Sequence, residues 1–116
     1  MSRPRAAIIG LAVLVSSVVA CAASGDSPAP SGDQATDPVL TLGRAVYQDH
    51  CARCHGKSGG GGAGPKLANG TVARDFPNPD DQAALIRTGR GAMPSWGGTL
   101  SDDEITAVVR YTREVL

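Results

Sequence analysis

The sequence predicts an all-α domain, with three main helices and long loops, in residues 38–116. Apolar residues recur there at helical spacing behind clear capping residues, and no segment shows the two-residue alternation of a strand. The run from Gly56 to Gly64 is too flexible and too polar for either regular structure. We therefore expect helices joined by loops, and no β-sheet.

The first helix is predicted from Val39 to His50. Asp37 is a suitable N-cap, and Pro38 suits the first turn because the N–H that it lacks has no partner there. Gly43 shares one face of this helix with Leu40 and Tyr47. Glycine costs about 1 kcal/mol in a helix interior, so we expect another helix to approach closely at Gly43.

The last helix is predicted to begin at Ser101, because Ser101-Asp102-Asp103-Glu104 is a capping-box sequence. Its three acidic side chains also favour the positive end of the helix dipole. Apolar residues then follow at helical spacing, with Tyr111 at the edge of the stripe. We expect this helix to cross the first one at Gly43, with Tyr47 and Tyr111 near the crossing.

A shorter helix is predicted from about Pro79 or Asp80 to Thr88, ended by Gly89. The glycine run from Gly59 to Gly62 has the composition of a phosphate-binding loop. However, it lacks both the preceding strand and the following Lys-Ser/Thr pair of such loops. The sequence therefore excludes a nucleotide-phosphate site there.

Residues 1–20 combine a basic start with an uncharged apolar run, as a secretory signal peptide does. The run is shorter than the roughly 20 residues of a membrane span. Val18-Val19-Ala20-Cys21 resembles a bacterial lipobox, which predicts cleavage before Cys21 and lipidation of that residue. The alternatives are an uncleaved anchor, or an ordinary signal peptide with an incidental cysteine. Residues 21–37, rich in Ser, Ala, Gly and Pro, are predicted to be a flexible membrane tether.

Charge and composition limit the functions that fit. The chain has no formal net charge, and nine basic residues face eleven acidic ones once Arg3 and Arg5 leave with the signal. This balance does not favour a nucleic-acid partner. Only four aromatic residues occur, and a domain of this size is marginal on its own hydrophobic burial.

Cys51-Ala52-Arg53-Cys54-His55 has the spacing of a c-type haem attachment site. The thiols of Cys51 and Cys54 would add across the two vinyl groups of one haem, and one helical turn sets their separation. His55, fixed beside the second thioether, is expected to be the proximal iron ligand. A haem would complete the marginal core, so we expect the haem-free chain to be largely unfolded.

Two other uses of this cysteine pair fit less well. A zinc site needs four ligands, and Cys51, Cys54 and His55 supply at most three. A thioredoxin-like pair belongs in a βαβ setting, which the glycine-rich loop after His55 contradicts.

Met93 is the predicted second axial ligand, since it is the only methionine left once Met1 departs. His50 directly precedes Cys51 and is poorly placed to reach the opposite haem face. Met93 lies in a loop without helical or strand character, which Pro94 holds extended. Trp96 has two interpretations: its indole N–H bonds a haem propionate, or its ring covers the haem edge as part of the core.

From about Pro38 to Leu116 the chain resembles a short bacterial class I cytochrome c. The resemblance rests on residues in family order: Gly43, Tyr47, the Cys51 to His55 motif, Gly64-Pro65-Lys66-Leu67, Met93-Pro94 and the terminal helix with Tyr111. It implies the class I cytochrome c fold around one covalent haem c, with His55 and Met93 as axial ligands. It also implies that the Pro65 carbonyl accepts a hydrogen bond from the His55 imidazole, and that Leu67 packs on the haem face.

The expected function is single-electron transfer, because two strong axial ligands leave the iron no open site for a substrate. The expected partners are a redox protein donor and acceptor, such as a dehydrogenase or a terminal oxidase, that dock weakly at an exposed haem edge. The expected location is outside the cytoplasm, at the outer face of the plasma membrane or in the periplasm. The alternative is a haem enzyme or gas sensor with a labile Met93. Peroxidase-type chemistry would want a distal acid–base group, and no spare histidine is placed for it.

Overall fold

The computed structural model describes residues 26–116, so the predicted signal peptide and Cys21 lie outside the described residues. Within these residues five α-helices follow one another: α1 (Pro38–Val46), α2 (Ala52–His55), α3 (Thr71–Asp75), α4 (Pro79–Thr88) and α5 (Asp102–Glu114). Within residues 26–116 the only β-type pairing is an isolated bridge between Arg90 and Met93. The all-α prediction is confirmed, with α1, α4 and α5 as the three main helices. No helix in this part of the chain is long and apolar enough to cross a membrane.

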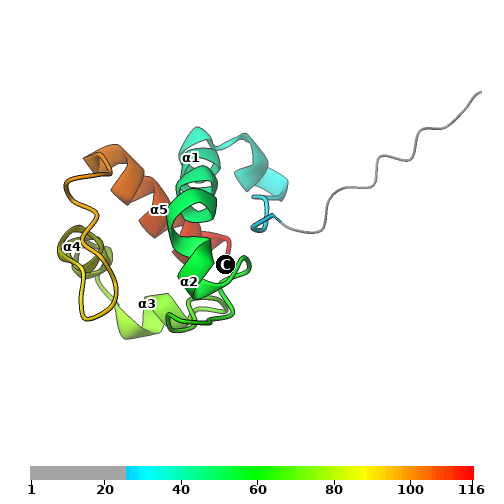
Figure 1. Cartoon of the computed structure of the whole chain (residues 1–116). Coiled ribbons are helices and arrows are strands. Elements are labelled where there is room, and N and C mark those ends of the chain that lie inside the picture. Colours follow the sequence, from blue (N-terminus) through cyan, green and yellow to red (C-terminus); the bar gives the residue numbers. More distant parts are fainter. Residues whose placement is uncertain (1–25) are drawn as a thin grey trace, which may run out of the picture.

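Helices α1 and α5 cross at Gly43, as predicted (Figure 1). A Cβ on Gly43 would collide with the Ala107 carbonyl and would lie 2.7 Å from the Tyr111 Cβ, so the two helices touch at backbone level. The rings of Tyr47 and Tyr111 lie beside the crossing with centroids 5.5 Å apart. This contact compensates the cost of a helical glycine.

The helix caps also agree with the sequence. The Asp37 carboxylate accepts a hydrogen bond from the Val39 N–H, and Pro38 occupies the first turn of α1. At α5, the Ser101 hydroxyl accepts from the Glu104 N–H, and the Glu104 carboxylate accepts from the Ser101 N–H at 2.8 Å. Both helices therefore begin where local sequence alone dictates.

Two features of the helical path differ from the prediction. The first helix is not a single α-helix to His50, because α1 ends at Val46 and a π-helical turn, Tyr47–Cys51, joins it to α2. A sequence pattern with an average period of 3.6 residues does not reveal a single π-helical turn within a helix. Helix α3 was not predicted, because its five residues are too few to show a periodic stripe.

Residues 26–37, which we call the N-terminal strap, pack on α1 and α5 (Figure 1). Three hydrogen bonds from side chains to backbone carbonyls hold it, in addition to the ion pair of 2.9 Å between Arg110 and Asp37. The Tyr111 hydroxyl donates to the Pro28 carbonyl at 2.6 Å, Arg44 Nε donates to the Ser27 carbonyl at 2.8 Å, and the Gln34 amide donates to the Glu114 carbonyl. This part of the chain differs from the flexible tether expected from composition, because composition does not register donors supplied by distant helices.

Candidate haem site

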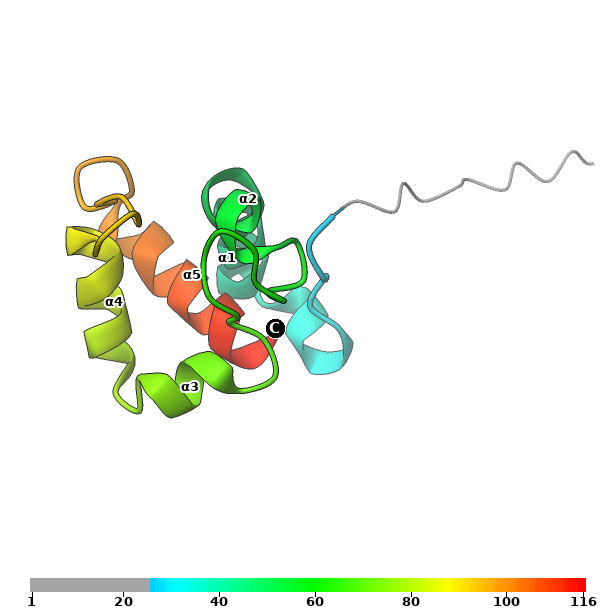
Figure 2. The same ribbon diagram turned by 60° about the horizontal axis from the view of Figure 1, so that its bottom comes forward.

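A cavity of about 330 Å³, which we call the haem pocket, lies between α2, the following loop, α4 and the loop after α4. Figure 2 shows these segments around the centre of the domain, with α5 running behind them. The walls are mainly apolar, with contributions from Leu67, Val72, Phe76, Leu85, Ile86 and Val108. The charged residues that line it are Arg53 and Arg90. Apolar walls of this kind suit a flat, largely apolar group.

Cys51 and Cys54 both line the haem pocket as free, partly buried thiols. They stand one helical turn apart, Cys51 at the end of the π-turn and Cys54 in α2. Burial, and to a lesser degree the neighbouring Cys54, raises the pKa of Cys51 to about 11. Without haem, the Cys51 thiol is therefore neutral at physiological pH.

His55 ends α2 and is held by the loop that follows it. Its Nδ1 lies 2.8 Å from the Pro65 carbonyl oxygen, the contact that the resemblance implies. The ring also packs on Gly64, where an added Cβ would lie 2.8 Å from Cε1. A hydrogen bond at Nδ1 leaves Nε2 as the nitrogen that can bind a metal. The Tyr47 hydroxyl donates to the Gly56 carbonyl at 2.6 Å and so fixes the end of α2 to the helix crossing.

Met93 lines the same pocket from residues 89–100, which we call the methionine loop. Arg90 and Met93 exchange backbone hydrogen bonds of 3.1 and 3.0 Å, which close the turn that carries the side chain. Gly89 has φ +72°, and a Cβ there would lie 2.6 Å from the Met93 carbonyl oxygen. The turn therefore depends on glycine at position 89.

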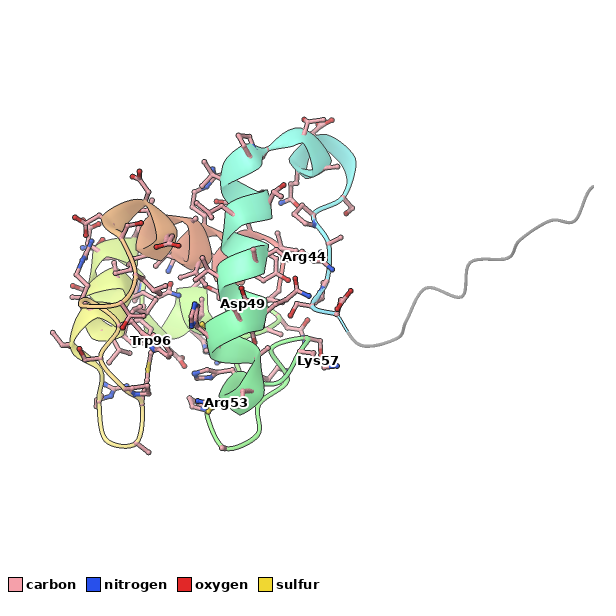
Figure 3. All side chains as sticks on the ribbon, turned by 45° about the horizontal axis from the view of Figure 1, so that its top comes forward. Arg44, Asp49, Arg53, Lys57 and Trp96 are labelled. Atoms are coloured by element: carbon pink, nitrogen blue, oxygen red, sulfur yellow. The ribbon has the colours of Figure 1, made fainter. Side chains whose placement is uncertain are left out.

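The structure brings together around one cavity every predicted haem-contacting residue: Cys51, Cys54, His55, Pro65, Leu67, Met93 and Trp96. Trp96 points from the methionine loop toward the helix that carries the thiols (Figure 3). Its ring stacks obliquely on His50, with centroids 5.0 Å apart. This contact was not predicted from the sequence, in which His50 was weighed only as an iron ligand.

A buried polar pair in the pocket wall was not predicted either. Gln82 and Thr112, from α4 and α5, are 4% and 5% exposed, and the Gln82 amide donates to the Thr112 hydroxyl at 2.8 Å. A glutamine at an inward helical position is the one signal that pointed to such a pair.

The donor set fits a covalent haem. Two thiols one turn apart match the two vinyl groups, and an imidazole and a thioether line the same mainly apolar cavity. When bound, the haem supplies a single-electron couple, and its rings would fill the space that the chain leaves open. The haem and the apolar side chains of the pocket would then pack together as one hydrophobic core.

Comparison with known proteins also supports a covalent haem site. Residues 38–111 match the family model described as cytochrome C oxidase, cbb3-type, subunit III. Cytochrome c6 of Tetradesmus obliquus is 34% identical over 80 residues, which cover 62% of this chain and 85% of that protein. Cytochrome c-551 of Bacillus subtilis is 29% identical over 109 residues, covering 92% and 91%.

A solved structure agrees as well. The crystal structure of cytochrome cL from Methylophaga aminisulfidivorans superposes with a TM-score of 0.62 at 26% identity. The match covers 69% of this chain and 55% of that one, so the chain corresponds to about half of the larger cytochrome. The fold is therefore the class I cytochrome c fold.

The family match decides between the haem, zinc and thiol interpretations of the cysteine pair, and the relatives decide between carrier and enzyme. The chain belongs to this family of c-type cytochromes, and it is an electron carrier with one covalently bound haem c.

Proposed function

We propose that this chain is an exported electron carrier, anchored by a lipid at Cys21, whose haem iron is bound by His55 and Met93. One observation carries the ligand assignment: the two residues line the same cavity as Cys51 and Cys54, from separate segments. The lipid anchor rests on the lipobox-like sequence before Cys21.

The residues around the pocket support one-electron chemistry. The Pro65 carbonyl accepts from Nδ1–H of His55, which orients the ring and makes Nε2 a stronger donor. A thioether opposite an imidazole raises the reduction potential. With two strong ligands, coordination stays constant between the oxidation states, so little rearrangement opposes electron transfer.

The partner is proposed to be a redox protein on each side of the electron relay. The family's own description names a terminal oxidase complex, which favours an oxidase as the acceptor. Arg53 and Arg90 are exposed at the pocket margin and could steer such a partner. Contact at this margin would be small and short-lived, as transient electron-transfer complexes are.

The ligand assignment is tested by absorption and electron paramagnetic resonance of the ferric protein. We expect a low-spin wild type with the weak far-red band of methionine-bound haem. Met93→Ala should lose that band, and its reduced form should bind carbon monoxide. Ser95 is an exposed residue of the same loop, so Ser95→Ala should match the wild type in both its far-red band and its response to carbon monoxide. A Met93→Ala spectrum identical to wild type would refute Met93 as the ligand.

The lipid anchor is tested separately, by growth with a labelled fatty acid in a bacterial host that matures both haem proteins and lipoproteins. We expect label and membrane association for the wild type, and neither for Cys21→Ser. Haem content should be equal in both, because Cys21 is not part of the attachment motif. A wild-type chain that takes up no label would refute the anchor.

A further inference from the structure

Trp96 connects two walls of the haem pocket. Its backbone N–H donates to the Ile86 carbonyl at 3.0 Å, which ties the methionine loop to α4. Its side chain lies across the pocket margin against His50, at a centroid separation of 5.0 Å and an interplanar angle of 60°. Tilted aromatic pairs at this separation are attractive beyond the area that they bury.

His50 stands in the π-turn, directly before the first attachment cysteine. Its ring lines the haem pocket beside Cys51, so it belongs to the wall that carries the covalent attachment. A π-turn is a local departure from α-helical register that recurs at functional sites. Here the turn lies where the helix passes from the buried crossing at Tyr47 to the pocket.

The backbone hydrogen bonds that tie the methionine loop to another element run to α4, where Gly97 donates to the Arg87 carbonyl. At its far end Leu100 is buried in the core beside α5. The turn around Met93 is closed only by its own backbone bonds with Arg90. The contact between Trp96 and the His50 ring, three residues after Met93, therefore links this part of the loop to the opposite wall, and its loss would leave the Met93 turn less constrained.

We propose that His50 and Trp96 form an aromatic clamp that holds the methionine loop against the attachment helix. They are positioning residues: the clamp keeps the Met93 sulfur at the iron and resists its displacement. This inference rests on the proposed ligation by Met93 and adds two residues that act through it.

The test measures how readily added imidazole displaces Met93 in the ferric protein, followed by loss of the far-red band. His50→Leu keeps the volume of the side chain but removes the ring, and we expect about two- to tenfold tighter apparent imidazole binding. His50→Phe retains a ring at the same place and should restore the wild-type value. A merely structural role would not separate these two variants.

A double-mutant cycle adds a second readout. Because Trp96→Leu breaks the same contact, His50→Leu added to it should have little further effect on imidazole binding. Fully additive effects, or equal imidazole binding by wild type and His50→Leu, would overturn the clamp. Failure of the ligation itself looks different, since the wild type would then show no far-red band before any imidazole is added.

Discussion

At the α1–α5 crossing, backbone touches backbone, with Gly43 against the Ala107 carbonyl and the two tyrosine rings beside them. Across the haem pocket, by contrast, the walls are separated by a cavity of about 330 Å³. The two regions share α5, which contributes Ala107 and Tyr111 to the crossing and Val108 and Thr112 to the pocket.

The difference shows which half of the fold the polypeptide can specify by itself. At the crossing, protein atoms fill the core, and the close packing of the two helices depends on the size of each side chain there, including the lack of one at Gly43. In the pocket, side chains such as Ile86 and Val108 pack on the protein core on one side and line the cavity on the other, where a haem would contact them. Packing at the crossing therefore depends on the sizes of the side chains, whereas packing in the haem pocket depends on the covalent attachment of the haem.

Loss of the attachment cysteines should have the largest effect, because it removes the filling of one whole region. We expect Cys51→Ser combined with Cys54→Ser to yield a haem-free, largely unfolded chain, since its remaining core is marginal. Far-ultraviolet circular dichroism and haem staining measure both effects. Cys21→Ser is the matched control and should keep haem and helicity. A folded haem-free double variant would contradict the contrast between the two regions.

Gly43→Ala should break the other region. The new Cβ would meet the Ala107 carbonyl and the Tyr111 Cβ, neither of which can move aside cheaply. We expect a loss of about 3 kcal/mol in the free energy of unfolding, at the upper end of the usual overpacking cost. Chemical denaturation of the haem-bound protein measures it. Gly98→Ala, which meets no atom within 4 Å, should change stability little; equal losses in both variants would argue against a tight crossing.

Gln82→Met tests the buried polar pair between α4 and α5. Removing the amide leaves the Thr112 hydroxyl without its donor, although that hydroxyl still donates to the Val109 carbonyl. We expect a loss of about 1 to 2 kcal/mol. Adding Thr112→Val should recover part of this loss, because no buried polar atom of the pair then lacks a partner. If the double variant is less stable by the full sum, the two side chains do not act as a pair.

Tyr111→Phe should loosen the N-terminal strap while keeping the ring in the crossing. The variant loses the hydrogen bond to the Pro28 carbonyl, worth about 1 kcal/mol. Hydrogen exchange over residues 28–36 should speed up several-fold. Tyr47→Phe is the matched control, because the Tyr47 hydroxyl donates to the Gly56 carbonyl and not to the strap. Faster strap exchange in Tyr47→Phe alone would contradict the assignment.

The smallest expected effect is on the stability of the fold at acid pH. Hydrogen bonds from the Ser101 backbone and hydroxyl hold the pKa of Glu104 below its ordinary 4.5. A carboxyl whose folded pKa is lowered stabilises the fold above its unfolded pKa, and that contribution fades as the pH falls below 4.5 through the folded value. Glu104→Gln should therefore flatten the acid limb of the stability curve. Unchanged slopes in acid denaturation would show that the cap is not linked to pH.

The two regions also differ in how much of each could be predicted from sequence. The caps at Asp37 and Ser101 follow from local rules, because each depends on residues a few positions apart. The crossing at Gly43 joins distant helices, and it was predictable because a glycine inside a helix indicates a close approach by another element. The attachment motif and Met93 follow from the chemistry of haem. Other contacts between distant segments were not predicted: the His50–Trp96 pair joins positions 46 apart, and the strap bonds to Tyr111, 83 residues from Pro28. Such pairs show no period and no motif, and only the folded chain brings them together.

The central claim is that one haem is bonded to this chain and forms the interior of its pocket. The most direct measurement is the intact mass and pyridine haemochrome spectrum of the wild-type protein after extraction in acidified acetone, which removes haem that is not covalently bound. We predict the mass of the processed, lipid-bearing chain plus one haem, with the haemochrome of a thioether-linked porphyrin. The mass of that processed chain without haem, from a host that matures other c-type cytochromes, would contradict the account.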